Sequence, residues 1–313
     1  MQVQGRTMRF KPVLPVFSLS LLLSCGDLPI NPGRQMPPEP TALENTNPHP
    51  DTTALLAPLS PSEPRVYSGG DCPNLLTGGP ITFQSNGLER QVELIYPNIL
   101  ADAMPVVFVW HWLGGSASGI IDRLELRAFS NQHQTVVVVP SMASGQPIWG
   151  FIGDPTNDLT LFDDVHSCLA AQIPIDLWKI STLGLSAGGL WSTYLSIHRA
   201  LVLASGFVMS GGTRVGLISY KTPATKLPML LAWGGSTDTW GSGSYFVDFN
   251  EATQEFATKL HEDGHFVVKC NHRKGHTLPP EVKEMAATWL LNHSFGIQSP
   301  YQANISELPS YCT

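Results

Sequence analysis

The sequence predicts an α/β fold in which a mostly parallel central sheet carries helices on both faces. Two observations predict it. Residues 104–110 and 135–140 are almost continuously apolar, as are the central strands of a sheet that is covered on both sides. These strand-like stretches also alternate along the chain with segments whose apolar residues follow a helical spacing. In a fold of this kind, the functional site is expected at the carboxyl ends of the strands.

The individual elements follow from the same patterns. Residues 91–96 alternate between polar and apolar side chains, which is typical of an early antiparallel strand. The further predicted strands cover residues 104–110, 135–140, 178–183, 201–209, 227–232 and 266–269. The predicted helices cover residues 162–171, 190–198, 246–261 and 281–291.

The N-terminus is expected to be an export signal. Three basic residues within 6–11 precede an apolar stretch, 13–23, that is too short to span a membrane. Cys25 follows this stretch directly, which resembles a bacterial lipobox and implies a lipoprotein signal peptide over 1–24. Cys25 would then carry the lipid and anchor the protein to a membrane. An ordinary secretory signal that happens to contain a cysteine is the alternative.

The lipobox resemblance implies a lipoprotein of the cell envelope, at the outer membrane or at the periplasmic or surface face. Secretion is the alternative. Residues 25–66 are expected to form a Pro-rich tether, because ten prolines between 28 and 65 prevent regular structure. Residues 67–313 are long enough for one α/β catalytic domain. The formal net charge of −7 argues against nucleic acid as a partner.

Four cysteines remain if Cys25 is lipidated, and an even number in an exported protein predicts two disulfides. Cys72 precedes the first predicted strand, whereas Cys270 ends the last one and Cys312 lies near the C-terminus. We therefore expect Cys72 to pair with Cys168, and Cys270 with Cys312. A free buried thiol at Cys168 is the alternative.

A G-x-S-x-G motif with one further glycine spans residues 184–189, Gly-Leu-Ser-Ala-Gly-Gly. A serine hydroxyl is a weak nucleophile, so it has to be presented on a tight turn beside a base. The motif lies between a predicted strand and a predicted helix, which is the setting that such a turn requires. Ser186 is therefore the candidate nucleophile. The alternative is a glycine-rich turn in a Rossmann-like unit.

Asp238 is the candidate acid. It lies just beyond the predicted strand 227–232, where a carboxylate can orient a histidine and stabilise the imidazolium that forms during reaction. Asp248 and Glu251 are its rivals, but both fall in or near the following helix, where side chains face solvent more naturally.

His276 is the candidate base. It lies in a loop between the last predicted strand and the last predicted helix, and the loop is followed by two prolines. His272 is the runner-up. The chain order Ser186, Asp238, His276 is the order that this kind of fold uses for a catalytic triad.

An oxyanion hole needs two backbone N–H groups that point at the developing negative charge. Ala187, directly after the nucleophile, is expected to supply one, and Trp112 or Leu113, after the strand 104–110, the other. His111 and Trp149 are candidates for contact with substrate. Ordinary packing of the loop is the alternative for Trp149. A metal site at His111 is not expected, because its sequence neighbourhood contains no second ligand.

Together these motifs resemble the polyhydroxybutyrate depolymerases and feruloyl esterases of the α/β-hydrolase superfamily. The resemblance covers residues 72–293 and is strongest at 184–189, at the loop 235–238 and at Gly275-His276. It implies the α/β-hydrolase fold and triad roles for the serine, aspartate and histidine identified above. It also implies a serine esterase without cofactor or metal that acts on hydroxyalkanoate oligomers, on feruloyl or acetyl esters, or on short-chain esters.

The chain departs from this family at one point. Members usually carry His-Gly at the end of the oxyanion strand, where this chain has His111-Trp112. Tryptophan adopts a positive φ less freely than glycine, so whether Trp112 or Leu113 donates to the oxyanion stays open. Two other functions are compatible with the sequence: a serine peptidase on the same fold, and a non-catalytic, hydrolase-like surface binding protein.

Overall fold

A computed structural model of the protein describes residues 59–146, 148–243 and 246–313. The predicted signal peptide 1–24, Cys25 and the predicted tether up to residue 58 lie outside the described residues. All described residues belong to one unit, Leu56–Thr313. In this described part, we find no helix with the length and apolar character that a membrane crossing requires.

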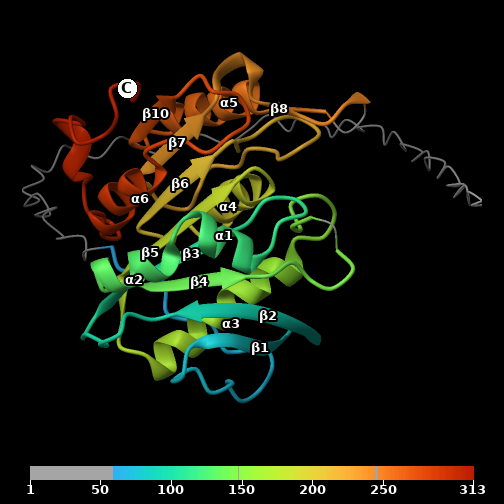
Figure 1. Cartoon of the computed structure of the whole chain (residues 1–313), viewed down its shortest axis with the longest axis vertical. Coiled ribbons are helices and arrows are strands. Elements are labelled where there is room, and N and C mark those ends of the chain that lie inside the picture. The colour runs from blue at the N-terminus through green and yellow to red at the C-terminus, as the bar shows by residue number, and fades with distance from the viewer. Residues whose placement is uncertain (1–58, 147, 244–245) are drawn as a thin grey trace, which may run out of the picture. The chain divides into compact units, whose positions relative to one another are not determined.

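An eight-stranded sheet forms the centre of this unit, in the order β1-β2-β4-β3-β5-β6-β7-β10 (Figure 1). The β1–β2 and β2–β4 pairs are antiparallel, and every pair from β4 to β10 is parallel. The predicted, mostly parallel sheet is thus confirmed. The strands are β1 Gly79–Ser85, β2 Leu88–Ile95, β3 Met104–Trp110, β4 Val136–Pro140, β5 Ile175–Leu185, β6 Ser205–Met209, β7 Met229–Trp233 and β10 Val267–Asn271.

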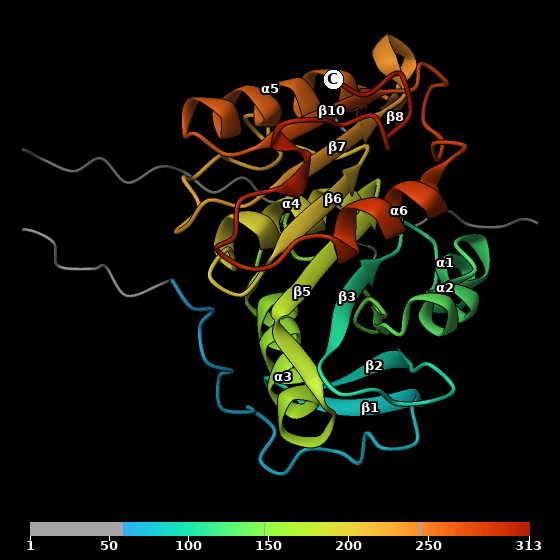
Figure 2. The same cartoon turned by 90° about the vertical axis from the view of Figure 1, so that its left-hand side faces the viewer.

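Helices cover both faces of the sheet, as the apolar runs predict. Val106 and Phe108 of β3 belong to one hydrophobic core, and Val107 and Val109 of the same strand belong to the other. Helices α3, α4 and α5 pack on the first core, and α1, α2 and α6 on the second (Figure 2). The helices are α1 Ala117–Arg123, α2 Leu126–His133, α3 Thr156–Gln172, α4 Ala187–His198, α5 Phe249–Glu262 and α6 Val282–Leu291.

Several boundaries differ from the prediction. Helix α3 begins at Thr156 rather than at residue 162, and β6 begins at Ser205 rather than at residue 201. The predicted helix 246–261 starts instead with a two-residue strand, β9 Val247–Asp248, which pairs with β8 Thr239–Trp240. β1, α1 and α2 are not predicted, because they are short or mix apolar and polar residues without a clear period.

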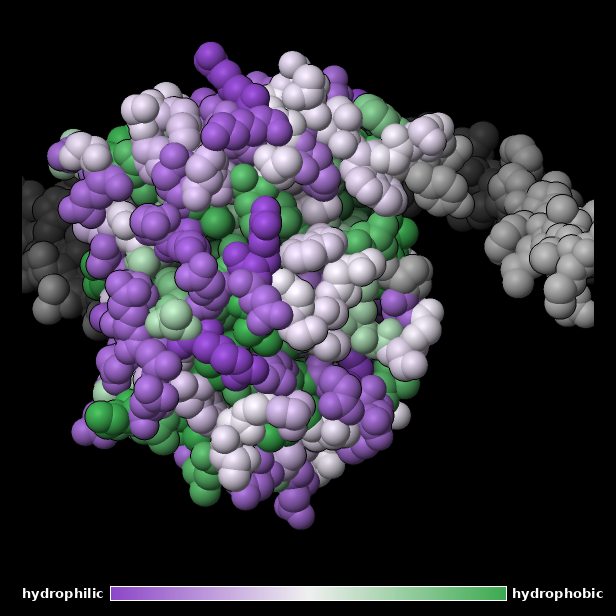
Figure 3. Space-filling view, in the orientation of Figure 1, coloured by the Kyte–Doolittle hydropathy of each residue, from purple (hydrophilic) through white to green (hydrophobic). Residues whose placement is uncertain are grey.

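Polar side chains cover the outer surfaces of α1, α2 and α6. Hydrophilic residues dominate much of this side of the molecule in Figure 3. Lys283 of α6 and Glu125, which precedes α2, form an exposed ion pair at 2.8 Å. These helices therefore show the ordinary two-sided character of elements that bury one face and expose the other.

Residues 59–66, which the prediction assigns to the end of the tether, contact the folded unit. The backbone N–H of Ser62 donates to the carbonyl oxygen of Leu201 at 2.7 Å. Arg65 lies 3.4 Å from the carboxylate of Asp163 on α3. The chain is thus held against the unit before the first strand begins.

Both predicted disulfides are present. Cys72 is bonded to Cys168 of α3, so the segment before β1 is tied to a helix on the first core. Cys270 of β10 is bonded to Cys312. The pairing is confirmed, and Cys168 is not a free thiol.

We expect that loss of the Cys72–Cys168 bond lowers the free energy of unfolding by about 3–5 kcal/mol, because this bond closes a long loop. The bond spans 96 residues, whereas Cys270–Cys312 spans 42. Urea denaturation of the C72A/C168A and C270A/C312A double variants measures both losses. A larger loss for the shorter loop would contradict the loop-closure explanation.

Stability should also fall in mild acid. Burial lowers the pKa of His166 and of His293 to about 4, whereas the unfolded chain has the ordinary value near 6.5. Between these values the unfolded state binds protons that the native state does not, so the free energy of unfolding decreases as the pH falls from 6.5 to 4.

The variant His166→Phe tests this dependence, because it removes one of the two groups together with a buried Nε2 that has no partner in the described residues. Between pH 7 and pH 5, we expect its free energy of unfolding to decrease by about 2 kcal/mol less than that of the wild type. Equal decreases in the two proteins would show that His166 is protonated alike in both states.

Candidate active site

Ser186 lies on a strained turn between β5 and α4. Its φ of 58° and ψ of −120° are rarely adopted by residues other than glycine, and such a conformation costs on the order of 1–3 kcal/mol. Glycine neighbours permit the turn, since a Cβ on Gly184 would lie 2.0 Å from the carbonyl oxygen of Gly188. The Ser186 N–H donates to the carbonyl oxygen of Met209 at 2.9 Å. The hydroxyl is therefore held at the carboxyl end of the sheet.

The structure brings the three predicted triad residues together. Ser186 Oγ donates to His276 Nε2 at 2.9 Å, and His276 Nδ1 donates to Asp238 Oδ1 at 2.7 Å. The Asp238 side chain has 0% exposed surface, while that of His276 keeps 22%. Serine, base and acid thus form one continuous hydrogen-bonded chain, the arrangement that makes a serine hydroxyl nucleophilic.

The two oxygens of the buried Asp238 carboxylate have different partners. Oδ1 accepts from His276, and Oδ2 accepts from Ser210 Oγ and from the Gly234 N–H, both at 2.8 Å. A buried carboxylate needs such donors, because burial without them disfavours the charged form strongly. Ser210 and Gly234 therefore fix the plane in which the acid meets the histidine.

The loops that carry acid and histidine touch through two glycines. The Gly275 N–H donates to the Gly234 carbonyl oxygen at 3.0 Å, and a Cβ on Gly234 would lie only 1.8 Å from the Gly275 carbonyl oxygen. The ring of Phe249 stacks on the His276 imidazole, with centroids 4.7 Å apart and planes 11° from parallel. The glycine contact thus fixes the loop before His276, and the aromatic ring restrains the imidazole itself.

The rival acids and the rival base are engaged elsewhere. Asp248 Oδ1 caps helix α5 by accepting from the Glu251 N–H at 3.0 Å. Glu251 forms an ion pair with Arg214. His272 is buried, and its Nδ1 accepts from the Lys274 N–H at 3.3 Å. Burial lowers the pKa of His272, and its hydrogen bond helps to shape the loop that leads to His276.

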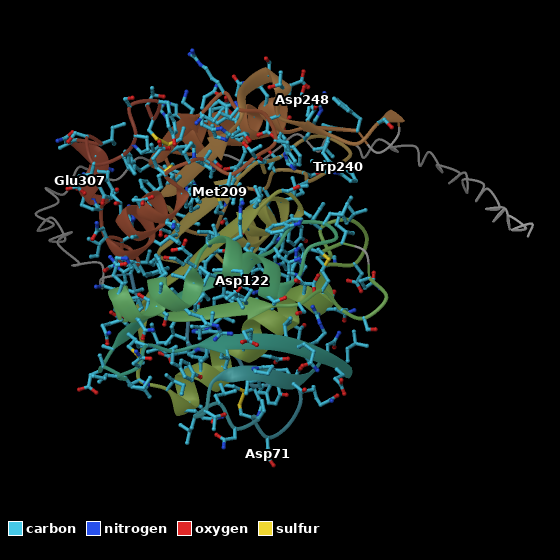
Figure 4. The ribbon with its side chains drawn as sticks, in the orientation of Figure 1. Asp71, Asp122, Met209, Trp240, Asp248 and Glu307 are labelled. Atoms are coloured by element: carbon cyan, nitrogen blue, oxygen red, sulfur yellow. A yellow bond between two sulfur atoms is a disulfide. The ribbon has the colours of Figure 1, made fainter. Side chains whose placement is uncertain are left out.

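A cavity of about 690 Å³ opens beside Ser186. Ser186, Ala187 and Leu113 line it together, and most of its remaining wall is apolar. Trp240 and Asp248, from the short hairpin of β8 and β9, lie at this wall and are labelled in Figure 4. Within the described ranges, no three His, Cys, Asp or Glu side chains gather in a way that could hold a metal ion. The remaining lining residues are Ile148, Phe151, Ile152, Leu190, Arg214, Val215, Gly216, Leu217, Phe246, Val247, Phe249 and Glu251.

Trp149 and His111, the predicted substrate contacts, do not line this cavity. Trp149 has 0% exposed surface and His111 has 2%. The indole Nε1 of Trp149 donates to the His111 carbonyl oxygen at 2.9 Å, so the two residues contact each other beneath the wall. The prediction that Trp149 lines the cavity is therefore wrong. Trp149 packs edge-on against Trp110 in the core, and its neighbours Ile148 and Phe151 line the cavity instead.

The comparisons with known proteins agree with this architecture. No protein-family model matches the chain, and no curated protein matches it in sequence. Among solved structures, native pOPH is similar with a TM-score of 0.66 at 17% identity, over 80% of this chain and 96% of that one. Native sOPH follows with a TM-score of 0.63 at 16% identity, over 80% and 97%. Acetyl xylan esterase from Aspergillus awamori has a TM-score of 0.54 at 15% identity, over 68% and 99%.

This chain has the α/β-hydrolase fold. Ser186 follows β5 and His276 follows the last strand, β10, which are the positions where this fold carries a nucleophile and a base. Two residues that support the site were not predicted. Ser210 is a polar residue directly after the buried strand β6, which is a weak signal in the sequence, whereas the stacking of Phe249 on His276 has no local signal at all.

Loss of the Ser210 hydroxyl should weaken the orientation of Asp238. We expect Ser210→Ala to lower kcat about three- to tenfold, the size of one net hydrogen bond of about 0.5–1.5 kcal/mol. Ser205→Ala is the matched control, because Ser205 is a buried serine at the other end of β6, the strand that Ser210 follows, and its hydroxyl contacts Ser181 at 3.0 Å. Steady-state kinetics on an activated ester measures both; an equal loss in the control would show that only stability is affected.

Proposed function

We propose that this protein is a serine esterase, which hydrolyses carboxylic esters through an acyl-serine intermediate. One observation carries the proposal: the hydrogen-bonded chain from Asp238 through His276 to Ser186 ends at a cavity that can admit an ester. Each link is within the distance that proton transfer requires. No cofactor is needed for this chemistry.

In the first half-reaction, Ser186 Oγ attacks the ester carbonyl carbon while His276 Nε2 takes the hydroxyl proton. The carbonyl oxygen becomes an oxyanion that accepts hydrogen bonds from the Ala187 N–H and from the loop at 112–113. The bond to the alcohol oxygen then breaks, and His276 donates its proton to that oxygen. Asp238 holds the imidazole in the required tautomer and stabilises its positive charge.

In the second half-reaction, water replaces the alcohol. His276 takes a proton from the water molecule as its oxygen attacks the acyl carbon. The same N–H groups stabilise the second oxyanion. The bond to Ser186 Oγ breaks, the oxygen regains its proton from His276, and the carboxylic acid leaves.

The apolar cavity supports an ester with an apolar acyl group as the substrate. Leu113, Leu190 and Phe151 contribute aliphatic and aromatic surface close to Ser186. Hydroxyalkanoate oligomers, feruloyl or acetyl esters and short-chain esters are the candidate classes, in line with the family that the motifs resemble. Similar structures include an acetyl xylan esterase and a pOPH variant in complex with pNPB.

We place this activity outside the cytoplasm. Two disulfides are typical of an oxidising compartment. The basic and apolar N-terminal segment and Cys25 support export and a lipid anchor, with residues 25–66 as the tether of a catalytic domain over 67–313. The ester would then be met at the cell envelope or beyond it.

Ser186→Ala tests the proposed function. We expect it to reduce kcat on p-nitrophenyl butyrate by on the order of 10⁶-fold, because the nucleophile is lost while the fold is kept. A fluorophosphonate probe should label the wild type but not the variant. Ser192→Ala, a buried serine of α4, is the control and should be labelled as the wild type is.

Two results would contradict this assignment. An unlabelled, inactive wild type would favour a non-catalytic binding protein. Labelling of Ser186 together with cleavage of peptides and not of esters would favour a peptidase.

Acyl chain length tests the role of the cavity. Each buried CH₂ group contributes about 0.8 kcal/mol, so we expect kcat/KM to rise roughly tenfold from p-nitrophenyl acetate to p-nitrophenyl butyrate. The leaving group is the same in both esters, so the difference reports on the acyl group alone. A constant or falling kcat/KM would place the acyl group outside the apolar cavity.

A further inference from the structure

We propose that His111 and Trp149 are positioning residues that orient the peptide between Trp112 and Leu113, so that the Leu113 N–H forms the oxyanion hole together with the Ala187 N–H. This inference rests on the proposed function. It concerns two side chains that lie beneath the cavity wall and do not touch substrate.

The carbonyl oxygen of Trp112 has two donors. His111 Nδ1 lies 2.9 Å from it, and the Gly115 N–H donates to it at 3.0 Å. A carbonyl oxygen only accepts, so Nδ1 carries the ring proton. His111 is 2% exposed, and burial lowers its pKa, which keeps the ring neutral at neutral pH.

In a trans peptide, the C=O and the following N–H point in opposite directions. Both donors lie on the carbonyl side of the 112–113 peptide, so its N–H points away from His111. That N–H belongs to Leu113, which lines the cavity with Ser186 and Ala187 and whose N–H finds no acceptor among the described residues. The N–H is therefore available to a ligand, as an oxyanion donor must be.

The backbone that leads into the loop at 112–113 contacts the turn that carries Ser186. A Cβ on Gly188 would lie 2.0 Å from the Trp110 carbonyl oxygen and 2.8 Å from that of His111. The backbone that enters the 112–113 loop thus rests directly on the first turn of α4. A small rotation at His111 would displace the second donor relative to Ser186.

Trp149 restrains that rotation. Its Nε1 donates to the His111 carbonyl oxygen at 2.9 Å, and its ring packs on the His111 imidazole with centroids 5.1 Å apart. The residue after it is anchored too, because the Gly150 N–H donates to Asp158 Oδ2 at 2.7 Å. Asp158 is in turn paired at 2.6 Å with Arg90, whose side chain has no exposed surface.

These contacts are compatible with a tryptophan at position 112, where members of the family that the motifs resemble usually carry glycine. The Trp112 indole lies against Gly115, where an added Cβ would be 2.9 Å from its Nε1 atom. Trp112 also packs against the second hydrophobic core and is not among the residues that line the cavity. Trp112 contributes its carbonyl oxygen to these contacts, and the N–H of the next residue, Leu113, is the one that faces the cavity.

The experiment compares p-nitrophenyl butyrate with its thiono analogue, in which sulfur replaces the carbonyl oxygen and accepts hydrogen bonds poorly. In His111→Leu and in Trp149→Phe, we expect kcat on the oxygen ester to fall about ten- to hundredfold with KM within about twofold. In the same variants, kcat on the thiono ester should fall much less. The ratio of kcat on the oxygen ester to kcat on the thiono ester therefore decreases. His111→Asn should recover most of the loss, because its amide N–H can replace Nδ1–H.

Two matched controls separate positioning from stability. His293 Nδ1 donates to the Trp289 carbonyl oxygen at 2.7 Å, and Trp289 Nε1 donates to the Gly206 carbonyl oxygen at 3.0 Å, both in the core away from the cavity. His293→Leu and Trp289→Phe should lower the thermal midpoint and leave the ratio of oxygen to thiono ester unchanged. If His111→Leu does not fold, the ratio of oxygen to thiono ester is measured in Trp149→Phe, which keeps an aromatic ring, and that ratio tests the positioning role.

The two proposals fail in different ways. A wild type that hydrolyses neither ester and is not labelled at Ser186 overturns the proposed function and the oxyanion role together. The positioning role alone is overturned if the wild type is active and the folded His111 and Trp149 variants keep its kcat. It is also overturned if kcat falls equally on both esters in these variants.

Discussion

The site depends on a contact between two stretches of backbone that only glycine permits. Gly188, in the first turn of α4, lies so close to the carbonyl oxygens of Trp110 and His111 that no Cβ fits between them. Gly189 also lies close to the Met209 carbonyl oxygen, at 2.3 Å for an added Cβ. Because of these contacts, the turn that carries Ser186 is wedged between the ends of β3 and β6. Ser186, the loop at 112–113 and Ser210 are thereby brought close to one another.

Much of this arrangement could be predicted from the sequence, because it is encoded locally. The apolar runs that become β3 and β4 are buried on both faces, and the glycines around Ser186 mark the turn before α4. Asp238 and His276 could be placed because each follows a strand in the expected order. The two disulfides could be predicted because Cys72 belongs to one edge of the expected sheet and Cys270 to the other, so that these two cysteines are not expected to pair with each other.

The rest depends on tertiary contacts that no local pattern records. Phe249 opens a helix in the sequence, and only the fold brings its ring against His276. For Trp149, the sequence leaves open contact with substrate and ordinary packing of its loop, and in the structure the indole is buried and donates to the His111 carbonyl oxygen. Helices α1 and α2 carry too few apolar residues at a regular spacing to be recognised, although they bury Ile120, Ile121 and Phe129.

The segment 148–152 combines two tasks in consecutive residues. Ile148, Phe151 and Ile152 shape the cavity, while Trp149 and Gly150 tie the same segment to His111 and Asp158. If the protein is the proposed esterase, a change of substrate preference at this segment also changes the catalytic rate, because a loop exchange that widens the cavity also alters the contacts of Trp149 and Gly150 with His111 and Asp158. Changes at Val215 or Leu217, on another loop of the cavity wall, leave those contacts intact.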